Sequence, residues 1–521
     1  MKNERIINII NYFRSEDWRY ADTLHSTAVN LLEICKRYSM PCTFLLLYDA
    51  MIRPEYSELF LKDPDPNIEV GLWLELSKEA VERAGLEWKE EHNWTWHVNP
   101  GMVLGYDAEA REKIIDELMG RFKSVFGKYP DSVGSWIIDT HTVNYLKDRY
   151  DVKAICICRE QYGTDGYTLW GGYYNQGYYP SRNNMFMPAQ TKEQQVNVPI
   201  FRMLGPDPIY QYDCTLDRNF NVDKNKCDVV TLEPYYTESG GNENWVNWYL
   251  NSVFSSEALS FSYLQAGQEN SFPWSTVEKG LEIQMKMIYD GFKNGKWRVE
   301  KLGDTGRWFS ENFKSTPAAA MTALDDPHNN GNQTVWYNCK NYRMNLHNRE
   351  GKICIRDMFL FDEGYSDRYL TEPAHGDSAV FNTLPVIDGF CWSGNNIHSA
   401  MYFVRRGSYE KADGRILSVK SENGNELRIV FELDGKKTVC VCREDRVCFD
   451  FTDNSFDLLF RYNSLKDTVI KEIGKSAVKY GYETAEYGIK LNGTAAPEEN
   501  GYRISPAADR LEISFFRGKE L

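Results

Sequence analysis

The chain has 521 residues, which is too long for one ordinary core but fits a barrel of about 250 residues followed by a further domain. Its formal net charge of −15 excludes the basic surface expected of a nucleic-acid-binding protein. Aromatic residues make up 14% of the chain, which suits either a ligand with apolar faces, such as a sugar, or a large aromatic core.

No stretch is long and apolar enough for a signal peptide or a membrane span, so we expect a soluble cytoplasmic protein, provided that no leader was removed. The twelve cysteines fall mostly inside apolar runs, such as residues 156–158 and 440–442. Two cysteines with one residue between them in a strand lie on the same face. This spacing suits neither a disulfide nor a zinc knuckle. We therefore expect reduced, buried cysteines.

The first 290 residues alternate short apolar runs with amphipathic segments. Continuous apolar runs are typical of strands buried on both faces of a parallel sheet. Seven such strands without a Gly-rich phosphate loop predict a (β/α)7 TIM-like barrel over residues 1–296. The strands are predicted at 6–13, 43–49, 68–75, 132–139, 154–160, 228–234 and 259–266, with helices at 21–38, 107–126 and 277–292.

The later part of the chain has a different pattern. Between the fifth and sixth predicted strands lies a long aromatic segment, 162–223, whose composition favours a functional loop over disorder. From about residue 334 the hydrophobic period changes to two, which predicts an antiparallel β-sandwich over 334–521. The stretch 297–333, rich in Gly, Pro, Ala and Asn, is the expected linker. The clearest strands are 415–420, 427–432, 437–442 and 446–451, with turn signals between them.

Acidic residues follow most of the predicted barrel strands, and active sites in such barrels form at the carboxyl ends of strands. Asp139 ends the fourth predicted strand and is a catalytic candidate, with a cap for the following helix as the alternative. Glu233 ends the sixth, where burial would raise its pKa toward that of a usable acid. Asp49 and Glu75 would hydrogen-bond substrate hydroxyls or hold Arg14.

Aromatic and polar side chains near these ends are candidates for binding a sugar, because aromatic rings stack on the C–H faces of sugars. Packing of one loop on another is the alternative for the aromatic residues, and an ordinary loop histidine is the alternative for His141. The substrate-binding candidates are His141, His97, Trp96, Trp94, Glu75, Asp49, Arg14, Trp170, Tyr173, Tyr178, Gln268 and Trp274.

The segment Trp-Ile-Ile-Asp-Thr-His at 136–141 resembles the Trp-x-x-Asp run that carries the nucleophile in glycoside hydrolase family 38. Residues 41–44 are similar to the second strand of polysaccharide deacetylases. The chain thus resembles the seven-stranded barrel superfamily of families 38 and 57 and the deacetylases. That resemblance implies a β-rich domain after the barrel and, from family 57, an acid/base at the end of the seventh strand, which corresponds to Glu269.

The chain departs from these families at their metal ligands. The His-x-Asp pair of family 38 is replaced by residues 11–14, Asn-Tyr-Phe-Arg, and the deacetylase Asp-Asp pair is missing there too. The deacetylase His-x-x-x-His is replaced by residues 73–77, Trp-Leu-Glu-Leu-Ser. We therefore expect no metal and no other cofactor.

Together these features predict a carbohydrate-active hydrolase, namely a metal-independent retaining glycosidase acting on an oligosaccharide or glycoside. Two carboxyl groups would flank the bond. Asp139 is the expected nucleophile, Glu269 the first choice of acid/base and Glu233 the second. A metal-dependent polysaccharide deacetylase and a non-catalytic carbohydrate-binding protein are the alternatives. Neither a nucleic acid nor a membrane is an expected partner.

Overall fold

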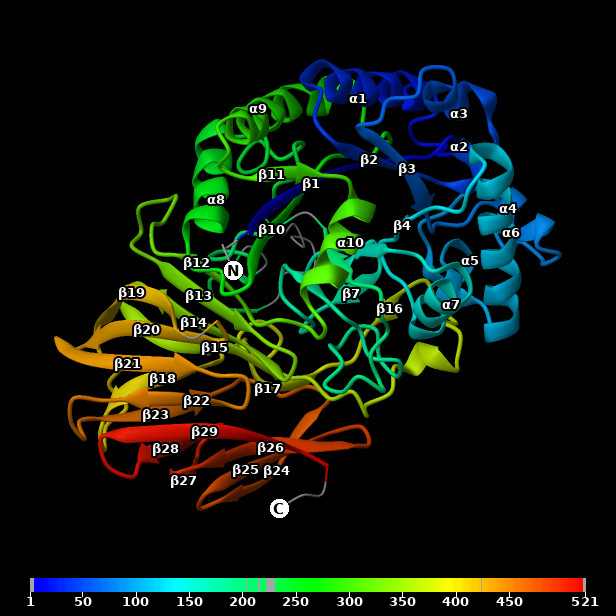
Figure 1. Ribbon diagram of the computed structural model, residues 1–521. Coiled ribbons are helices and arrows are strands. Elements are labelled where there is room, and N and C mark those ends of the chain that lie inside the picture. The colour runs from blue at the N-terminus through cyan, green and yellow to red at the C-terminus, as the bar shows by residue number, and fades with distance from the viewer. Residues whose placement is uncertain (1–3, 204, 214–215, 222–229, 423, 519–521) are drawn as a thin grey trace.

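The structure is a computed structural model that describes residues 4–203, 205–213, 216–221, 230–422 and 424–518. A barrel of strands and helices occupies the upper part of Figure 1, and a β-rich region lies below it. No helix of the described residues is long and apolar enough to cross a bilayer. The described cysteines form no disulfide, and all except Cys391 are buried.

The barrel is a mostly parallel sheet that is nearly closed. Its strands lie in the order β10-β1-β2-β3-β4-β5-β9, each parallel to its neighbours, and no ladder in the described chain joins β9 to β10. The rings of Phe201 and Tyr263, 4.8 Å apart, bridge these two strands. The strands are β1 (Glu4–Phe13), β2 (Cys42–Leu46), β3 (Ile68–Trp73), β4 (Ser132–Gly134), β5 (Ala154–Ile157), β9 (Ile200–Arg202) and β10 (Phe261–Ala266), with β8 (Gly177–Tyr178) antiparallel to β9 and β11 (Arg298–Glu300) parallel to β1.

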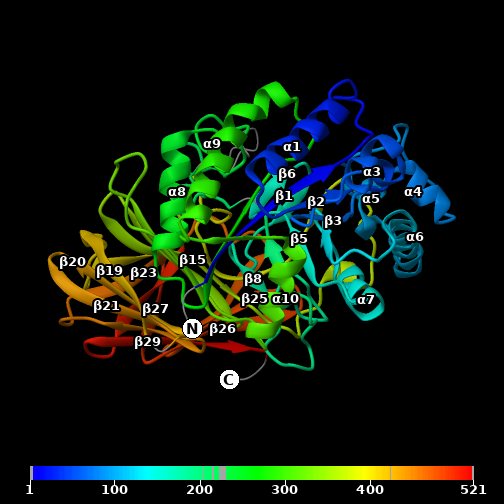
Figure 2. The ribbon, with the colours of Figure 1, turned by 45° about the horizontal axis from the view of Figure 1, so that its top comes forward.

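Helices form the outer layer of the barrel (Figures 1 and 2). Local sequence explains where α6 begins and ends. Its N-cap Asp107 accepts the Ala110 N–H, and Gly127 ends the helix at φ 78°. The helices are α1 (Leu24–Tyr38), α2 (Tyr48–Ile52), α3 (Pro54–Leu61), α4 (Lys78–Arg83), α5 (Val98–Gly101), η1 (Val103–Gly105), α6 (Ala108–Phe126), α7 (Thr140–Tyr150), α8 (Glu243–Ser255), α9 (Trp274–Lys293) and α10 (Leu302–Asn312).

The β-rich region contains two large antiparallel sheets. The first has the order β12-β13-β14-β15-β18-β23-β28-β27, with β17 also paired to β15, and the second has the order β19-β20-β21-β22-β29-β26-β25-β24. Phe403 of the first sheet contacts Phe431 and Phe449 of the second, so the two sheets share a core. A small sheet, β16-β7-β6, joins the barrel insertion to this region.

The bounds of the first sheet are β12 (Ala319–Ala323), β13 (Gln333–Asn338), β14 (Tyr342–Arg349), β15 (Lys352–Leu360), β17 (Leu384–Asp388), β18 (Ala400–Arg405), β23 (Phe456–Arg461), β27 (Gly493–Glu498) and β28 (Gly501–Pro506). Those of the second are β19 (Gly414–Glu422), β20 (Glu426–Leu433), β21 (Lys436–Cys442), β22 (Arg446–Asp450), β24 (Thr468–Gly474), β25 (Ala477–Tyr482), β26 (Ala485–Leu491) and β29 (Arg510–Arg517). The remaining elements are β6 (Gln161–Thr164), β7 (Tyr167–Leu169), β16 (Ala379–Val380) and η2 (Arg368–Leu370).

Two sequence predictions about the fold are wrong. The sixth barrel strand is β9, which lies inside the segment expected to be a loop, and not the predicted strand 228–234. Residues 228 and 229 lie outside the described residues. Thr231 forms only an isolated antiparallel bridge to Pro206. The expected linker, 297–333, instead contains β11, α10 and β12. An apolar run alone does not distinguish a strand from a buried loop, which explains the first error.

Helix α10 covers the amino-terminal end of the barrel. The Leu302 N–H donates to Thr43 Oγ1 at 2.9 Å, and the Gly303 N–H donates to Glu69 Oε2 at 3.0 Å. Thr43 and Glu69 lie near the starts of β2 and β3. This contact leaves the opposite end, where the parallel strands finish, for the loops that form a site.

Candidate active site at the carboxyl end of the barrel

Four side chains that follow barrel strands meet at the carboxyl end of the sheet. Arg14 follows β1 directly, Glu75 lies two residues beyond β3, and Trp136 lies two residues beyond β4. Glu269 follows β10, and its backbone forms an isolated parallel bridge with Tyr12 of β1. They line one pocket of about 520 Å³, part of it open solvent, together with Arg19, Tyr20, Trp94, Trp96, Asp165, Tyr167, Ser271 and Phe272.

Arg14 links the two acids of this pocket. Its Nη2 lies 3.2 Å from Glu75 Oε2 and 2.7 Å from Glu269 Oε2. Two contacts to one nitrogen place these carboxylate oxygens within about 6 Å of each other. The Glu75 side chain is 1% exposed and that of Glu269 is 13% exposed, so Glu269 is the acid that a ligand in the pocket reaches more easily.

Burial and charge set the protonation of this pair. Burial raises the pKa of Glu75 to about 7, opposed by Arg14 and reinforced by the charge of Glu269. Burial also raises the pKa of Glu269, while Arg14 lowers it. Although burial disfavours the charge of Arg14, Glu75, Glu269 and Asp17 raise its pKa, so it stays cationic. The arrangement can hold one protonated and one ionised carboxyl group near neutral pH.

Aromatic rings form the walls of the pocket. The Trp94 indole donates to Glu75 Oε2 at 3.2 Å, and the Arg14 guanidinium lies 4.3 Å from the centroid of the Trp94 ring. The rings of Tyr12 and Trp73 stack at 4.2 Å, and Trp136 meets both edge-on. This packing fixes the position of Trp136 in the wall of the pocket.

The hairpin β6–β7 contributes the remaining edge of the pocket. Asp165 lies at its tip with φ 51°, and Tyr167 begins β7. The Tyr167 hydroxyl donates to the Trp96 carbonyl at 2.7 Å, which fastens the hairpin over the pocket. This hairpin belongs to the aromatic segment that the sequence indicated as functional.

Asp139 lies elsewhere and makes the contacts of a structural residue. Strand β4 ends at Gly134, and Asp139 is the N-cap of α7, accepting the Thr142 N–H at 2.9 Å and the Thr142 hydroxyl at 2.7 Å. The carboxylate is fully buried and pairs with Arg111 at 2.8 Å. The structure therefore does not bring Asp139 together with Glu269, and it favours the helix cap that the sequence left open.

Glu233 also lies outside the lining of this pocket, because the strand predicted to deliver it is not part of the barrel. It is half-buried, and its charge acts on Tyr12 and Arg159. Glu269 is the one member of the three predicted catalytic residues that lines the pocket.

Of the substrate-binding candidates, Arg14, Glu75, Trp94 and Trp96 line the pocket. Asp49 instead accepts the Ser15 and Glu16 N–H groups and holds the loop after Arg14, and Gln268 Oε1 accepts the Glu269 N–H. The others do not line it. His97 pairs with Glu90, and His141 pairs with Glu112. Trp274 begins α9, Trp170 lines a different hollow, and the buried Tyr173 and Tyr178 donate to the carbonyls of Pro317 and Met185.

Sequence reasoning missed several lining residues. Trp136 belongs to the same motif as Asp139. A predicted fourth strand that ended at Gly134 would have indicated Trp136 as the residue at the strand end. The Asp165-Gly166 pair is a turn signal that could have located the hairpin. Arg19, Tyr20, Ser271 and Phe272 come from loops with no distinguishing pattern.

The described residues contain no group of three or more His, Cys, Asp or Glu side chains placed to hold a metal ion. Between the two acids of the pocket stands a guanidinium instead. The residues present in the described chain thus do not fit the metal centre of a metal-dependent deacetylase.

The fold and the pocket define a nearly closed parallel barrel with a polar, aromatic-walled pocket at its carboxyl end, followed by a β-rich region. No family model matches the sequence, and no curated protein matches it. Among solved structures, the chain is similar to one from Parabacteroides distasonis whose name assigns it provisionally to a glycoside hydrolase/deacetylase class. The identity is 13% with a TM-score of 0.53, over 73% of this chain and 90% of that one. At this identity the likeness shows the fold alone.

Two further solved structures are more remote. One is named a probable polysaccharide deacetylase from Pseudomonas aeruginosa PAO1, at 11% identity and a TM-score of 0.36, over 59% of this chain and 92% of that chain. The other is the alpha-amylase AmyC from Thermotoga maritima, at 9% identity and a TM-score of 0.30, over 58% and 74% of the two chains.

Proposed function

We propose that this protein is a carbohydrate-active hydrolase that cleaves a glycosidic bond with retention of configuration, with Glu269 as nucleophile and Glu75 as acid/base. One observation carries the proposal: two carboxyl groups share the same Arg14 nitrogen at the floor of an aromatic-walled pocket. The proposal keeps Glu269 from the sequence prediction but changes its role, and it replaces Asp139 by Glu75.

The spacing of the acids supports retention. Retaining glycosidases hold their two carboxyl groups about 5–5.5 Å apart, whereas inverting enzymes separate them by about 6.5–9.5 Å to admit a water molecule. The limit of about 6 Å between the two Oε2 atoms that share the Arg14 nitrogen is compatible with the first arrangement.

The surroundings of the two acids support the assignment of roles. A pKa of about 7 lets Glu75 carry a proton at neutral pH and donate it to the leaving oxygen. Glu269 is the more exposed acid and makes the shorter contact to Arg14, which favours its ionised, nucleophilic form.

The reaction then follows from these positions. Glu269 attacks the anomeric carbon as Glu75 protonates the departing glycosidic oxygen, which leaves a glycosyl ester on Glu269 and an ionised Glu75. Glu75 next takes a proton from water, and the oxygen of that water attacks the anomeric carbon and releases Glu269. In the free enzyme the Arg14 guanidinium contacts Glu269 Oε2 and offsets the negative charge of this nucleophile.

The kind of ligand follows from the lining of the pocket. Trp94, Trp96 and Tyr167 offer ring faces or edges, while the charged groups offer partners for hydroxyls. The negative charge of the chain and the acids in the pocket favour a neutral sugar over an anionic one. The provisional name of the Parabacteroides structure, which shares the fold, agrees with this class.

The test is hydrolysis of a panel of aryl α- and β-glycosides by the wild type and by Glu269→Gln and Glu75→Gln, with and without a chelator. We expect chelator-resistant turnover. Glu75→Gln should lower kcat by about 10²–10⁴-fold, most for poor leaving groups, and Glu269→Gln should abolish it. Glu112→Gln, which alters an acid that pairs with His141 outside the pocket, is the matched control and should retain activity.

Two outcomes would contradict the proposal. Chelator-sensitive release of acetate from acetylated sugars, without glycoside cleavage, would identify a deacetylase. Full activity of Glu269→Gln on every cleaved glycoside would remove the nucleophile assignment.

A further inference from the structure

A half-exposed tryptophan stands beside the proposed active site. Trp18 lies in the loop between β1 and α1, and 55% of it is exposed, among the highest values for a large apolar side chain of the described chain. An indole exposed to water lacks the favourable free energy of burial. An exposed ring that is held in place is therefore a candidate for binding a ligand.

The ring of Trp18 is held in place by its neighbours. It stacks on His92 with centroids 5.0 Å apart and an interplanar angle of 23°, and it lies 6.4 Å from the Trp96 ring. Trp96 in turn supports the Arg19 guanidinium at 4.8 Å. We call Trp18 and His92 the outer platform, and it presents a fixed aromatic face to solvent.

The outer platform borders a second hollow that adjoins the acid pocket. Trp94 lines both. Asp17, which also lines the second hollow, pairs with Arg14 at 3.4 Å and with Arg19 at 2.8 Å. The remaining lining residues are Ser15, Glu16, Trp18, Ala21, Glu91, His92 and Asn93.

We propose that the outer platform is a subsite for a second sugar residue, so that the substrate is a neutral oligosaccharide or polysaccharide and not a glycoside of a single sugar. The inference rests on the proposed function, because it places the cleaved bond at Glu75 and Glu269. Aromatic faces stack on the C–H faces of pyranose rings, and carboxylate and amide groups of Glu91 and Asn93 can bond their hydroxyls. The acids around the platform disfavour an anionic polymer.

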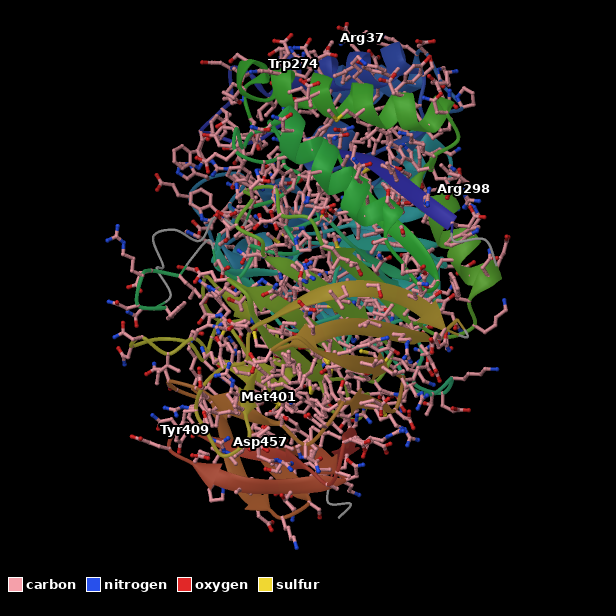
Figure 3. The ribbon with its side chains drawn as sticks, turned by 90° about the vertical axis from the view of Figure 1, so that its left-hand side faces the viewer. Arg37, Trp274, Arg298, Met401, Tyr409 and Asp457 are labelled. Carbon is pink, nitrogen blue, oxygen red and sulfur yellow. The ribbon has the colours of Figure 1, made fainter. Side chains whose placement is uncertain are left out.

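The test compares Trp18→Ala with the wild type on substrates of increasing length. On glycosyl fluorides of one sugar, whose leaving group has no ring to stack, we expect unchanged kcat/KM. On neutral oligosaccharides of two to five residues we expect kcat/KM to fall by roughly 3- to 10-fold, the effect of losing one stacked ring. Tyr409→Ala is the matched control, because Tyr409 is 63% exposed and projects from the β-rich region, far from the barrel (Figure 3).

Binding is measured separately by titration calorimetry of Glu269→Gln, with and without Trp18→Ala, using malto-, cello-, manno- and xylopentaose as probes. Weaker binding of a pentaose to the double variant than to Glu269→Gln alone supports the platform. If the wild type cleaves no glycoside in that case, only the hydrolysis proposal fails. Cleavage that is insensitive to chain length and to Trp18→Ala overturns the platform and leaves hydrolysis standing. Equal losses on short and long substrates, or no pentaose binding at millimolar concentration, also overturn it.

Discussion

Arg14 determines how the two acids of the pocket behave. With both glutamates ionised the group of three side chains carries one net negative charge, and a single proton neutralises it. Because the three groups are buried and in contact, the glutamates titrate as a pair. The guanidinium between the two acids thus supplies the positive charge that holds them close together.

The raised pKa of Glu75 predicts an alkaline limit to activity. In the proposed mechanism Glu75 donates its proton, so kcat/KM should fall as the pH rises through about 7, where the residue ionises. The pH dependence of kcat/KM on an aryl glycoside measures this. Glu75→Gln should be slower and should lack that limb, and an unchanged alkaline limb in this variant would exclude Glu75 as the acid.

Arg14→Lys should move the acidic limb of the same profile. Arg14 lowers the pKa of Glu269, and lysine offers a single ammonium where arginine reaches both glutamates and Asp17. The pKa of Glu269 should therefore rise, and activity should be lost at a higher pH on acidification. Arg182→Lys, at an exposed pair with Asp148, is the control. An acidic limb that does not move would show that Arg14 does not act on the nucleophile.

At the scale of single elements, periodicity predicted most of the barrel but placed some strand ends too late. Ile137 and Ile138 are buried, so the apolar run continues beyond Gly134 although β4 ends there. The same effect made residues 228–234 resemble a strand, while the short β9 gave too little pattern to detect. The strand-end rule indicated Arg14 and Glu75, and the family resemblance indicated Glu269, whereas Asp165 and Tyr167 reach the pocket through the hairpin of the insertion.

Asp139→Asn tests the structural role of that residue in α7. Asparagine is an equally good N-cap, so the main loss is the charge opposite the buried Arg111. Breaking a buried ion pair costs about 3–5 kcal/mol. We expect chemical denaturation to show a loss of about this size, with kcat of the folded enzyme unchanged. A normal stability combined with a lost kcat would restore Asp139 as a catalytic residue.

At the scale of the whole molecule, the barrel and the β-rich region are joined by a shared core. One continuous cluster of buried apolar side chains extends from Ile6 in β1 to Ile513 in β29. A charged network crosses the junction: the fully buried Arg343 of β14 pairs with Glu160, beyond β5, at 2.8 Å and with Asp357 of β15 at 2.7 Å. The second region therefore supports the barrel and, through β16, the hairpin at the pocket.

Arg343→Met should destabilise both regions together. It leaves Glu160 and Asp357 buried without this partner, at a cost of about 3–5 kcal/mol. Calorimetry should show one unfolding transition for the wild type and one, at lower temperature, for the variant. Arg415→Met, which removes an exposed pair with Glu432, should change little. Two separate transitions in the wild type would contradict a shared core.

The most direct test of the active site is to trap the intermediate. The enzyme is incubated with a 2-deoxy-2-fluoro glycoside of the sugar that it cleaves fastest, and its peptides are analysed by mass spectrometry. A retaining mechanism at this pocket predicts one added glycosyl group, on the peptide that contains Glu269. A label on Asp139 or Glu75, or an inverted first product with no label, would contradict the account.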